Sequence, residues 1–303
     1  MSILKYYENE IPKLKETAIT IGKFDGIHLG HLKLIKTITS INNEGLKSVV
    51  FTFNTEQNGQ GCITTENEKK DFLKEEKIDY LISYSLDNTI KNMTGEEFIE
   101  EILIKRLDAK VIVVGEDFRF GYNRTGDINL LRKMSDKYGY KLIICNKIKV
   151  SYDSNTDVSS TLIKKWIVDG CVKKANCMLG YPYFIQGTVI SGQQLGRTIG
   201  FPTANISLNS NKIIPCKGVY AVKVAISDEE YKGIANIGNK PTVGDSFDKG
   251  LEVHIIDFDK DIYNKTIKVK FIECIREEKK FGSVELLKEQ ISADLICALE
   301  ILN

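Results

Sequence analysis

The chain of 303 residues contains only three histidines, and its seven cysteines include no CxxC pair. Because structural zinc sites are built from clusters of cysteine and histidine, we do not expect a zinc site. The cysteine number is odd and the residues are scattered, which favours free thiols over a disulfide framework. These features predict a protein of the reducing cytoplasm.

The sequence also lacks an excess of either charge. Lysine and arginine total 42 and aspartate and glutamate total 41, so the net charge is +1. This balance argues against nucleic acid or an anionic membrane as a partner. No apolar run approaches the ~18 residues of a membrane helix, and the first ten residues contain no apolar signal-peptide core. The oligomeric state is left open.

The order of expected elements divides the chain into two domains. Up to about Leu179, apolar strands alternate with helices, which predicts an α/β domain with a parallel sheet covered by helices on both faces. The clearest strands are residues 48–53, 110–114 and 141–145. A capping box at residues 94–97 opens a helix with Phe98, Ile102 and Leu103 on its apolar face. Another helix is capped by Asp127 and ends before Gly139.

From Tyr183 onward, strand-like segments follow one another without a long helix between them. They are residues 184–191, 219–226, 231–237, 251–256 and 266–275. This pattern predicts an antiparallel barrel or sandwich. A final helix follows from Ser283 to about Leu302, with an apolar face of Leu287, Ile291, Leu295 and Leu299. We expect the domains to be residues 1–180 and 181–303.

Residues 22–31, with the sequence GKFDGIHLGH, carry two of the three histidines, His28 and His31. A strand-like segment precedes them and a helical one follows, so they lie in a glycine-rich turn at a helix N-terminus. Such a turn lets a backbone approach a ligand, and the helix N-terminus attracts phosphate. Two residues capping a helix would be the simpler interpretation. The combination favours nucleotidyl transfer, in which imidazole donors face the charge that develops on phosphate.

Two further segments of the first half can contribute to such a site. Residues 115–121, GEDFRFG, place Asp117 and Arg119 in a dense loop after a strand, where ligands of parallel sheets bind. Residues 157–161, DVSST, open a helix with three hydroxyl groups, Ser159, Ser160 and Thr161, and Lys164 follows within a turn. An ordinary turn and a simple N-cap are the alternatives. Beside the histidine pair, we favour a binding loop and a second phosphate clamp.

In the second half, residues 192–205 join two strands and contain three glycines, an arginine and a Thr-x-Asn pair. We expect a phosphate and magnesium loop, although a long structural loop is the alternative. The strand at residues 251–255 places Glu252 and His254 on one face. A carboxylate beside a histidine could act as a general base, but from this alternation alone we favour an exposed strand face.

Together these segments resemble the bacterial bifunctional riboflavin kinase/FMN adenylyltransferase family, also called prokaryotic FAD synthetase. In the first half the resemblance rests on GKFDGIHLGH, GEDFRFG and VSSTLIK. In the second half it rests on GTVISGQQLGRTIGFPTANI, GVYAV, ANIGNKPTVG, LEVHIIDF and IREEKKFGSVELLKEQISADL. The motifs keep their order over nearly the whole chain.

The resemblance implies a Rossmann-like nucleotidyltransferase domain that adenylylates FMN and a six-stranded antiparallel riboflavin kinase barrel with a terminal helix. It implies ATP and Mg²⁺ at both sites, with riboflavin, FMN and FAD as substrates and products. His28 and His31 would contact ATP phosphates, Thr203 and Asn205 would hold Mg²⁺, and Glu252 would accept the proton of the riboflavin 5′-hydroxyl. The remaining binding candidates are Gly22, Phe24, Asp25, Gly26, Gly30, Asp117, Arg119, Ser159, Ser160, Thr161, Lys164, Gly192, Gly196, Arg197 and Gly200.

The sequence departs from the family pattern at four places. Residues 54–59 stand where the family has a turn with proline and histidine, and Lys164 stands where the family has an arginine after the SST segment. At the domain junction, Tyr181-Pro182 replaces the family's Arg-Pro. After the strand that contains Glu252, Tyr263-Asn264 replaces the family's Tyr-Gly. Lys164 keeps the charge of arginine without its bidentate geometry. Two alternatives are therefore kept: a riboflavin kinase with a degenerate first domain, and a flavin- or nucleotide-binding regulator without turnover.

Overall fold

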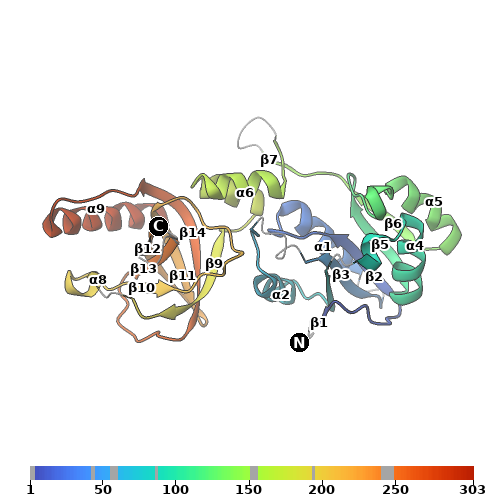
Figure 1. Cartoon of the computed structure of the whole chain (residues 1–303), viewed down its shortest axis with the longest axis horizontal. Coiled ribbons are helices and arrows are strands. Elements are labelled where there is room, and N and C mark those ends of the chain that lie inside the picture. Colours follow the sequence, from blue (N-terminus) through green and yellow to red (C-terminus); the bar gives the residue numbers. More distant parts are fainter. Residues whose placement is uncertain are drawn as a thin grey trace. The chain divides into compact units, whose positions relative to one another are not determined.

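The computed structural model describes residues 4–41, 45–54, 61–85, 88–150, 156–192, 195–239 and 249–303. The chain forms two compact units, Met1–Ser159 and Ser160–Asn303. Each unit has its own sheet and its own core (Figure 1). Most of residues 54–59, where the sequence departs from the family's turn, and most of the segment NKPTVG lie outside the described residues.

The first unit is built on a six-stranded sheet whose order is β1-β4-β3-β2-β5-β6. Every neighbouring pair is parallel. The strands are β1 (Lys5–Glu8), β2 (Thr17–Gly22), β3 (Lys47–Phe53), β4 (Tyr80–Tyr84), β5 (Ala109–Gly115) and β6 (Lys141–Cys145). The expected parallel sheet is confirmed, and β1 and β4 are two strands that the sequence pattern did not indicate.

Helices cover both faces of this sheet. They are α1 (Leu29–Ser40), α2 (Glu66–Glu75), α3 (Asn88–Lys91), α4 (Gly95–Glu97), the π-helical η3 (Phe98–Arg106), the 3₁₀ turn η4 (Tyr122–Arg124) and α5 (Ile128–Tyr138). Alternate residues of the central strands enter two different cores. Ile19 and Val49 pack with Phe98 and Leu103 on one face, whereas Ala18 and Val50 join a cluster on the other face. This two-sided burial explains why the strands read as continuous apolar runs.

The helix ends follow the capping residues read from the sequence. Thr94 and Glu97 form the expected capping box before α4, and the buried residues of η3 include Phe98, Ile102 and Leu103. Asp127 caps α5, and Gly139 ends it in the left-handed conformation, with φ 73°. A short hairpin of β7 (Lys149–Val150) and β8 (Thr156–Asp157) precedes the second unit.

The second unit is a closed antiparallel barrel with the strand order β10-β13-β12-β11-β14-β9. Its strands are β9 (Phe184–Ile190), β10 (Ala204–Ile206), β11 (Gly218–Ile226), β12 (Glu229–Asn239), β13 (Lys249–Ile255) and β14 (Thr266–Glu277). The helices are α6 (Ser160–Val168), α7 (Val172–Leu179), α8 (Leu195–Thr198) and α9 (Val284–Leu302). The five expected strands are confirmed, and β10 closes the barrel.

Helix α9 packs on the outer face of the barrel, but its buried stripe differs from the expected one. Ala298 and Leu302 enter the core with Val219 and Ala221, whereas Leu299 is 36% exposed. The expected inclusion of Leu299 is therefore wrong. A strict spacing of four residues drifts around a helix of 3.6 residues per turn, so the last member of the row leaves the contact face.

Replacing Thr94 with alanine removes the side chain that accepts the Glu97 amide hydrogen bond of the capping box. We expect this substitution to lower the free energy of unfolding by ~1 kcal/mol. Ser135→Ala is the matched control, because that hydroxyl donates to the Arg132 carbonyl within α5 and caps nothing. Denaturant unfolding measures both, and equal effects of the two substitutions would contradict the capping assignment.

Candidate functional site

The turn between β2 and α1 places His28 at the N-cap of α1. Its Nδ1 atom accepts a hydrogen bond from the backbone amide of His31, 3.4 Å away. Because Nδ1 is the acceptor, the neutral imidazole of His28 carries its proton on Nε2. A single N–H donor is thereby fixed at the positive end of a helix, as the sequence predicts for a phosphate site.

The two histidine rings stack, with centroids 3.7 Å apart and planes inclined by 14°. Burial lowers the pKa of His28 to about 4. Burial also lowers the pKa of His31 well below its usual range, and the neighbouring His28 and Lys69 lower it further. Both rings are therefore neutral at pH 7, where an N–H of each can donate to a ligand without adding charge.

Phe24 and Asp25 stabilise this turn through a ring contact and two hydrogen bonds. Phe24 is fully buried with its ring 4.9 Å from that of His31, and Asp25 Oδ1 accepts the backbone amides of Ile63 and Thr64 at 2.8 and 3.3 Å. A Cβ on Gly26 would lie 2.9 Å from the Ile63 side chain, and Gly26 has φ +88°, so this position requires glycine. Gly22 ends β2, and Gly30 lies in the first turn of α1 beside the His28 ring.

The loop after β5 lies at the same edge of the sheet, since β5 pairs with β2 in parallel. The negative charge of Asp117 acts on His28, where it opposes the effect of burial on the pKa. Arg119 forms an ion pair with Asp127 at 2.6 Å, at the N-terminus of α5. The loop thus places the exposed carboxylate of Asp117 where its charge acts on His28. Its arginine, Arg119, is held by Asp127, the N-cap residue of α5.

Ser159 and Ser160 lie on the two sides of the division between the units, and Thr161 and Lys164 belong to α6 in the second unit. The predicted clamp over the histidines therefore remains a prediction. The hydroxyl run does open a helix as expected, since α6 begins at Ser160.

Two adjoining cavities lie on the second unit. One, of about 630 Å³, is lined by Arg197, Lys260 and Tyr263 among others. The second, of about 370 Å³, is lined by Glu252, by charged side chains that include Arg276 and Asp294, and by apolar side chains of the segment after α8, of α9 and of the barrel. The apolar ones include Ile199, Phe201, Ile234, Leu287 and Ile291. Thr203 lines both cavities.

The strand register brings the predicted kinase residues together. Asn205 of β10 lies directly opposite Glu252 of β13, so the two side chains share one face of the sheet. Asn205 is buried and packs against Gly192, where a Cβ would lie 2.1 Å from the amide nitrogen of Asn205. Glycine is required there by this close approach. His254 bonds through Nδ1 to the Pro202 carbonyl at 2.8 Å and so holds the strand next to Thr203.

Three other predicted loop residues lie in the segment that leads to Thr203. Gly196 and Arg197 belong to α8, and Gly200 has φ +92° in the turn that follows it. The loop expected at residues 192–205 therefore contains a short helix and a strand. The departure at Tyr263-Asn264 is accommodated as well, because Asn264 has φ 62°, a conformation that asparagine tolerates better than most residues.

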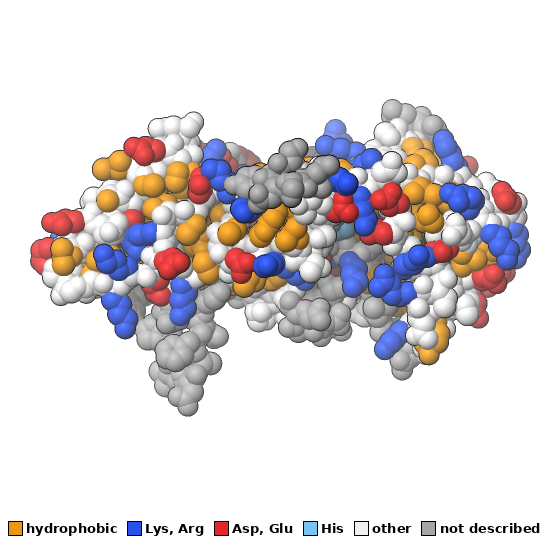
Figure 2. Space-filling model, turned by 90° about the horizontal axis from the view of Figure 1, so that it is seen from above, with side chains coloured by type: hydrophobic (Ala, Val, Ile, Leu, Met, Phe, Trp, Pro, Cys, Tyr) orange, Lys and Arg blue, Asp and Glu red, His pale blue; other side chains and the backbone are white. Residues whose placement is uncertain are grey.

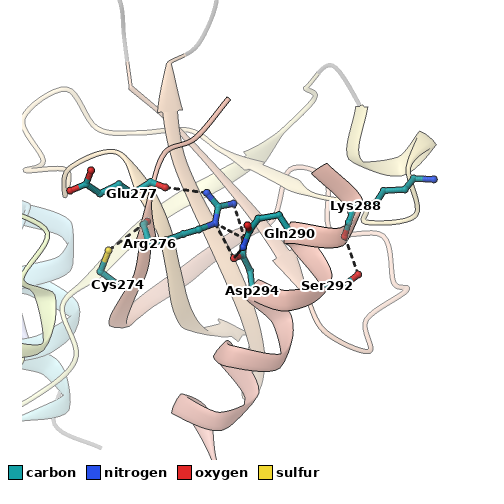
Figure 3. A network of polar contacts seen from close by, with 7 residues as sticks. All are labelled: Cys274, Arg276, Glu277, Lys288, Gln290, Ser292 and Asp294. Atoms are coloured by element: carbon teal, nitrogen blue, oxygen red, sulfur yellow. Dashed lines mark hydrogen bonds and ion pairs between the residues drawn. The ribbon is translucent and has the colours of Figure 1, made fainter. Parts of the chain in front are cut away.

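An ion pair that sequence reasoning missed forms one wall of the smaller cavity (Figure 3). Arg276 of β14 holds Asp294 of α9 with both Nε and Nη2, at 2.8–3.0 Å, and Gln290 also donates to Asp294. Asp294 is only 2% exposed. Its position within the apolar periodicity of α9 was a signal, because a carboxylate there needs a buried partner.

Charged side chains of both signs are interspersed on the face of the molecule seen in Figure 2. The expected absence of a nucleic-acid partner is compatible with this mixture but is not tested by it.

Comparison with known proteins identifies both halves of the chain. A family model described as FAD synthetase matches residues 10–162, and one described as riboflavin kinase matches residues 179–302. A bifunctional riboflavin kinase/FMN adenylyltransferase of Buchnera aphidicola is 37% identical over 100% of this chain and 99% of its own. The Escherichia coli K12 protein of that description is 36% identical, over 93% and 91%.

The chain belongs to the bifunctional riboflavin kinase/FMN adenylyltransferase family. A Bacillus subtilis member is 34% identical over 92% of this chain and 90% of its own. Among solved structures, one described as a macrolide-efflux protein from Streptococcus pneumoniae has a TM-score of 0.86 and 32% identity, with 98% of both chains covered. None of the helices in the described ranges has the length and apolar character that crossing a bilayer requires.

The lowered pKa of His28 predicts an acid-sensitive fold. The folded protein binds fewer protons than the unfolded chain between the ordinary pKa of 6.5 and about 4. The free energy of unfolding should therefore fall as the pH is lowered through that window. Histidine NMR should show His28 titrating near pH 4, with His28→Gln assigning its signal and reducing the pH dependence of stability. Titration of His28 near pH 6.5 would contradict its buried, neutral state.

Proposed function

We propose that this protein makes both flavin cofactors. Residues 181–303 phosphorylate riboflavin to FMN with ATP, and residues 1–180 adenylylate FMN to FAD with release of pyrophosphate. The observation that carries the proposal is that Thr203 borders two adjoining cavities, one of which also contains Glu252 and the other Arg197. Such a junction is what transfer of a phosphoryl group between a flavin and a nucleotide requires.

The lining of each cavity suggests its substrate. The smaller cavity suits the flavin, because its apolar walls accept a planar ring system and Glu252 is available as a base. The larger cavity suits ATP by its size, and Arg197 and Lys260 can pair with phosphates there, with Asp259 and Asp261 in the same lining. The phosphoryl group would then be transferred from ATP to the flavin beside Thr203.

One row of paired residues runs across five barrel strands and supports this orientation. Asn205, Glu252, Asn236, Val219 and Arg276 are successive partners from β10 to β14. Glu252 and Arg276 are three strand spacings apart, about 14 Å along the sheet. This span suits an extended ribityl chain and its flavin ring, with the 5′-hydroxyl at Glu252 and the ring toward Arg276.

Thr203 and Asn205 fit a magnesium ion that is held mainly by ATP. Mg²⁺ takes oxygen ligands and commonly binds through one or two protein groups and substrate phosphates. The Thr203 hydroxyl lies at the junction of the cavities, and Asn205 is held by packing on Gly192. When bound, the ion would neutralise charge on the transferring γ-phosphoryl group. Glu252 would take the proton of the 5′-hydroxyl as the hydroxyl oxygen bonds to the γ-phosphorus and the bond from that phosphorus to ADP breaks.

The first unit supports adenylyl transfer through the histidine pair. His28 offers a fixed Nε2–H donor at the N-terminus of α1, which suits the phosphates of ATP. An oxygen of the FMN phosphate attacks the α-phosphorus of ATP, and the bond to the departing pyrophosphate breaks. No covalent intermediate with the protein is needed.

Neither alternative interpretation is favoured. A kinase with a degenerate first domain does not account for the intact histidine pair or for the FAD synthetase match over residues 10–162. A regulator without turnover does not account for Glu252 beside Thr203 and Asn205. The cytoplasmic location and the clamp of Ser159 to Thr161 with Lys164 remain part of this proposal.

Glu252→Gln should abolish formation of FMN from riboflavin, because an amide cannot accept the proton of the 5′-hydroxyl. Adenylylation of supplied FMN should be unchanged. The flavins can be separated by chromatography after incubation with ATP and Mg²⁺. Normal phosphorylation of riboflavin by this variant would remove Glu252 from its role as the base.

His31→Ala should give the reverse result. FAD synthesis from FMN should be lost, because the stacked pair and the first turn of α1 lose a member, while phosphorylation of riboflavin continues. The same chromatographic assay follows both steps. Unchanged FAD output would show that adenylyl transfer does not use this turn.

A further inference from the structure

One amide side chain in the smaller cavity of the second unit has no role in the steps described so far. Asn236 of β12 lines this cavity together with Glu252. Asn236 is exposed, and the described part of the chain forms no hydrogen bond with its side-chain amide. Water can satisfy an exposed amide, so exposure by itself does not indicate a ligand. Its position in the sheet and the space beside it do.

The strand register places this amide next to Glu252. Asn236 is paired with Glu252 of β13 on one side and with Val219 of β11 on the other. Directly opposite residues share a face of the sheet, with their Cβ atoms about 5 Å apart. Val219 is in turn paired with Arg276. Asn236 therefore lies between the carboxylate proposed to take the 5′-hydroxyl proton and the end of the row proposed for the flavin ring.

The space beside the amide depends on Gly238, which lies two residues further along β12 and therefore on the same face. A Cβ at this position would lie 3.3 Å from Nδ2 of Asn236 and 2.9 Å from Oε1 of Glu278, another residue of the cavity lining. The amide thus turns along its own strand instead of bonding to Glu252. An amide and a carboxylate border one small polar space, which a larger side chain in place of Gly238 would fill.

Riboflavin presents two chemically different parts to this cavity. Its ring system is planar and suits the apolar walls, whereas its ribityl chain carries secondary hydroxyls at the 2′, 3′ and 4′ positions. A hydroxyl that leaves water for apolar neighbours such as Val219 and Ile234 loses free energy unless it finds a hydrogen-bond partner. An amide can both donate to a hydroxyl and accept from it. Asn236 is the side chain that offers this where the chain must lie if its 5′-hydroxyl is at Glu252.

We propose that Asn236 makes the kinase specific for a polyhydroxylated side chain, by forming a hydrogen bond with a secondary hydroxyl of the ribityl group. This inference rests on the proposed function of the second unit. Asn236 takes no part in the proton transfer, which belongs to Glu252. Its contact binds the chain in the substrate and in the transition state alike, so its loss affects KM more than kcat.

The experiment measures the coupling between Asn236 and the hydroxyls. The parent and Asn236→Leu, which has a similar volume and no polar atoms, phosphorylate riboflavin or its 2′-, 3′- or 4′-deoxy analogue with ATP and Mg²⁺. With riboflavin, Asn236→Leu should raise KM about fivefold, the effect of one lost hydrogen bond, and change kcat less than twofold. In the parent, one deoxy analogue should show the same loss. Asn236→Leu should not distinguish that analogue from riboflavin, because the contact is already absent.

Lys232→Ala is the matched control on the same strand. Lys232 lies on the same face of β12, donates to Asn303, and is not among the described residues that line the cavity. Its KM for riboflavin should stay within twofold of the parent value. Thermal unfolding reports whether each variant is folded, and Asn236→Ala, which should show the same pattern as Asn236→Leu, replaces that variant if leucine disturbs the strand.

Two results would overturn the proposal. One is an additive loss for all three deoxy analogues, which would mean that no hydroxyl contacts Asn236. The other is a lowered kcat and a shifted pH dependence of kcat at unchanged KM, which would mean that Asn236 acts only through Glu252. If the parent protein itself makes no FMN from riboflavin, the proposed function fails instead.

Discussion

The hydrogen-bonded register between neighbouring strands is the constraint on which both candidate sites depend. In the barrel, pairing of β10 with β13 sets Asn205 opposite Glu252, and one residue of slippage would send Glu252 to the other face. In the first unit, parallel pairing of β2 with β5 brings the histidine turn and the loop at residues 115–121 to one edge. Residues far apart in the chain meet only because these pairings are fixed.

Burial then determines the chemical state of the side chains that the register assembles. Neutral histidines result from burial against Phe24 and against each other, and a charged lysine is retained nearby only with Glu66 as a partner. The barrel uses the same principle at Asp294, which is buried and held by Arg276. In both units a buried charge is acceptable because a precisely placed opposite charge accompanies it.

The sequence predicted much of the fold because its signals are local. Alternation revealed most strands, and Thr94, Asp127 and Ser283 marked helix starts through their side-chain oxygens. β1, β4 and β10 were missed, because their short segments acquire their identity from pairing with neighbours. Leu299 was misplaced because a spacing of four residues departs slowly from the helical repeat.

Some residues of the candidate sites could be recognised from the sequence and others could not. Histidines in a glycine-rich turn and the Thr-x-Asn pair could be recognised from residue type and spacing. Lys69 and Arg276 could not, because a cationic side chain looks solvent-exposed until its surroundings are known. Asp294 gave a signal that was overlooked, its place in the apolar periodicity of α9. The residues that sequence reasoning missed are thus charged groups whose roles depend on burial.

The central claim is that one chain uses two different phosphorus atoms of ATP at two sites. Incubation with riboflavin and Mg²⁺, using ATP labelled at either the α- or the γ-phosphate, tests it directly. The account predicts that FMN carries only the γ-label, whereas FAD carries the γ-label from the first step and the α-label from the second. FAD formed without the α-label, or FMN formed without the γ-label, would contradict it.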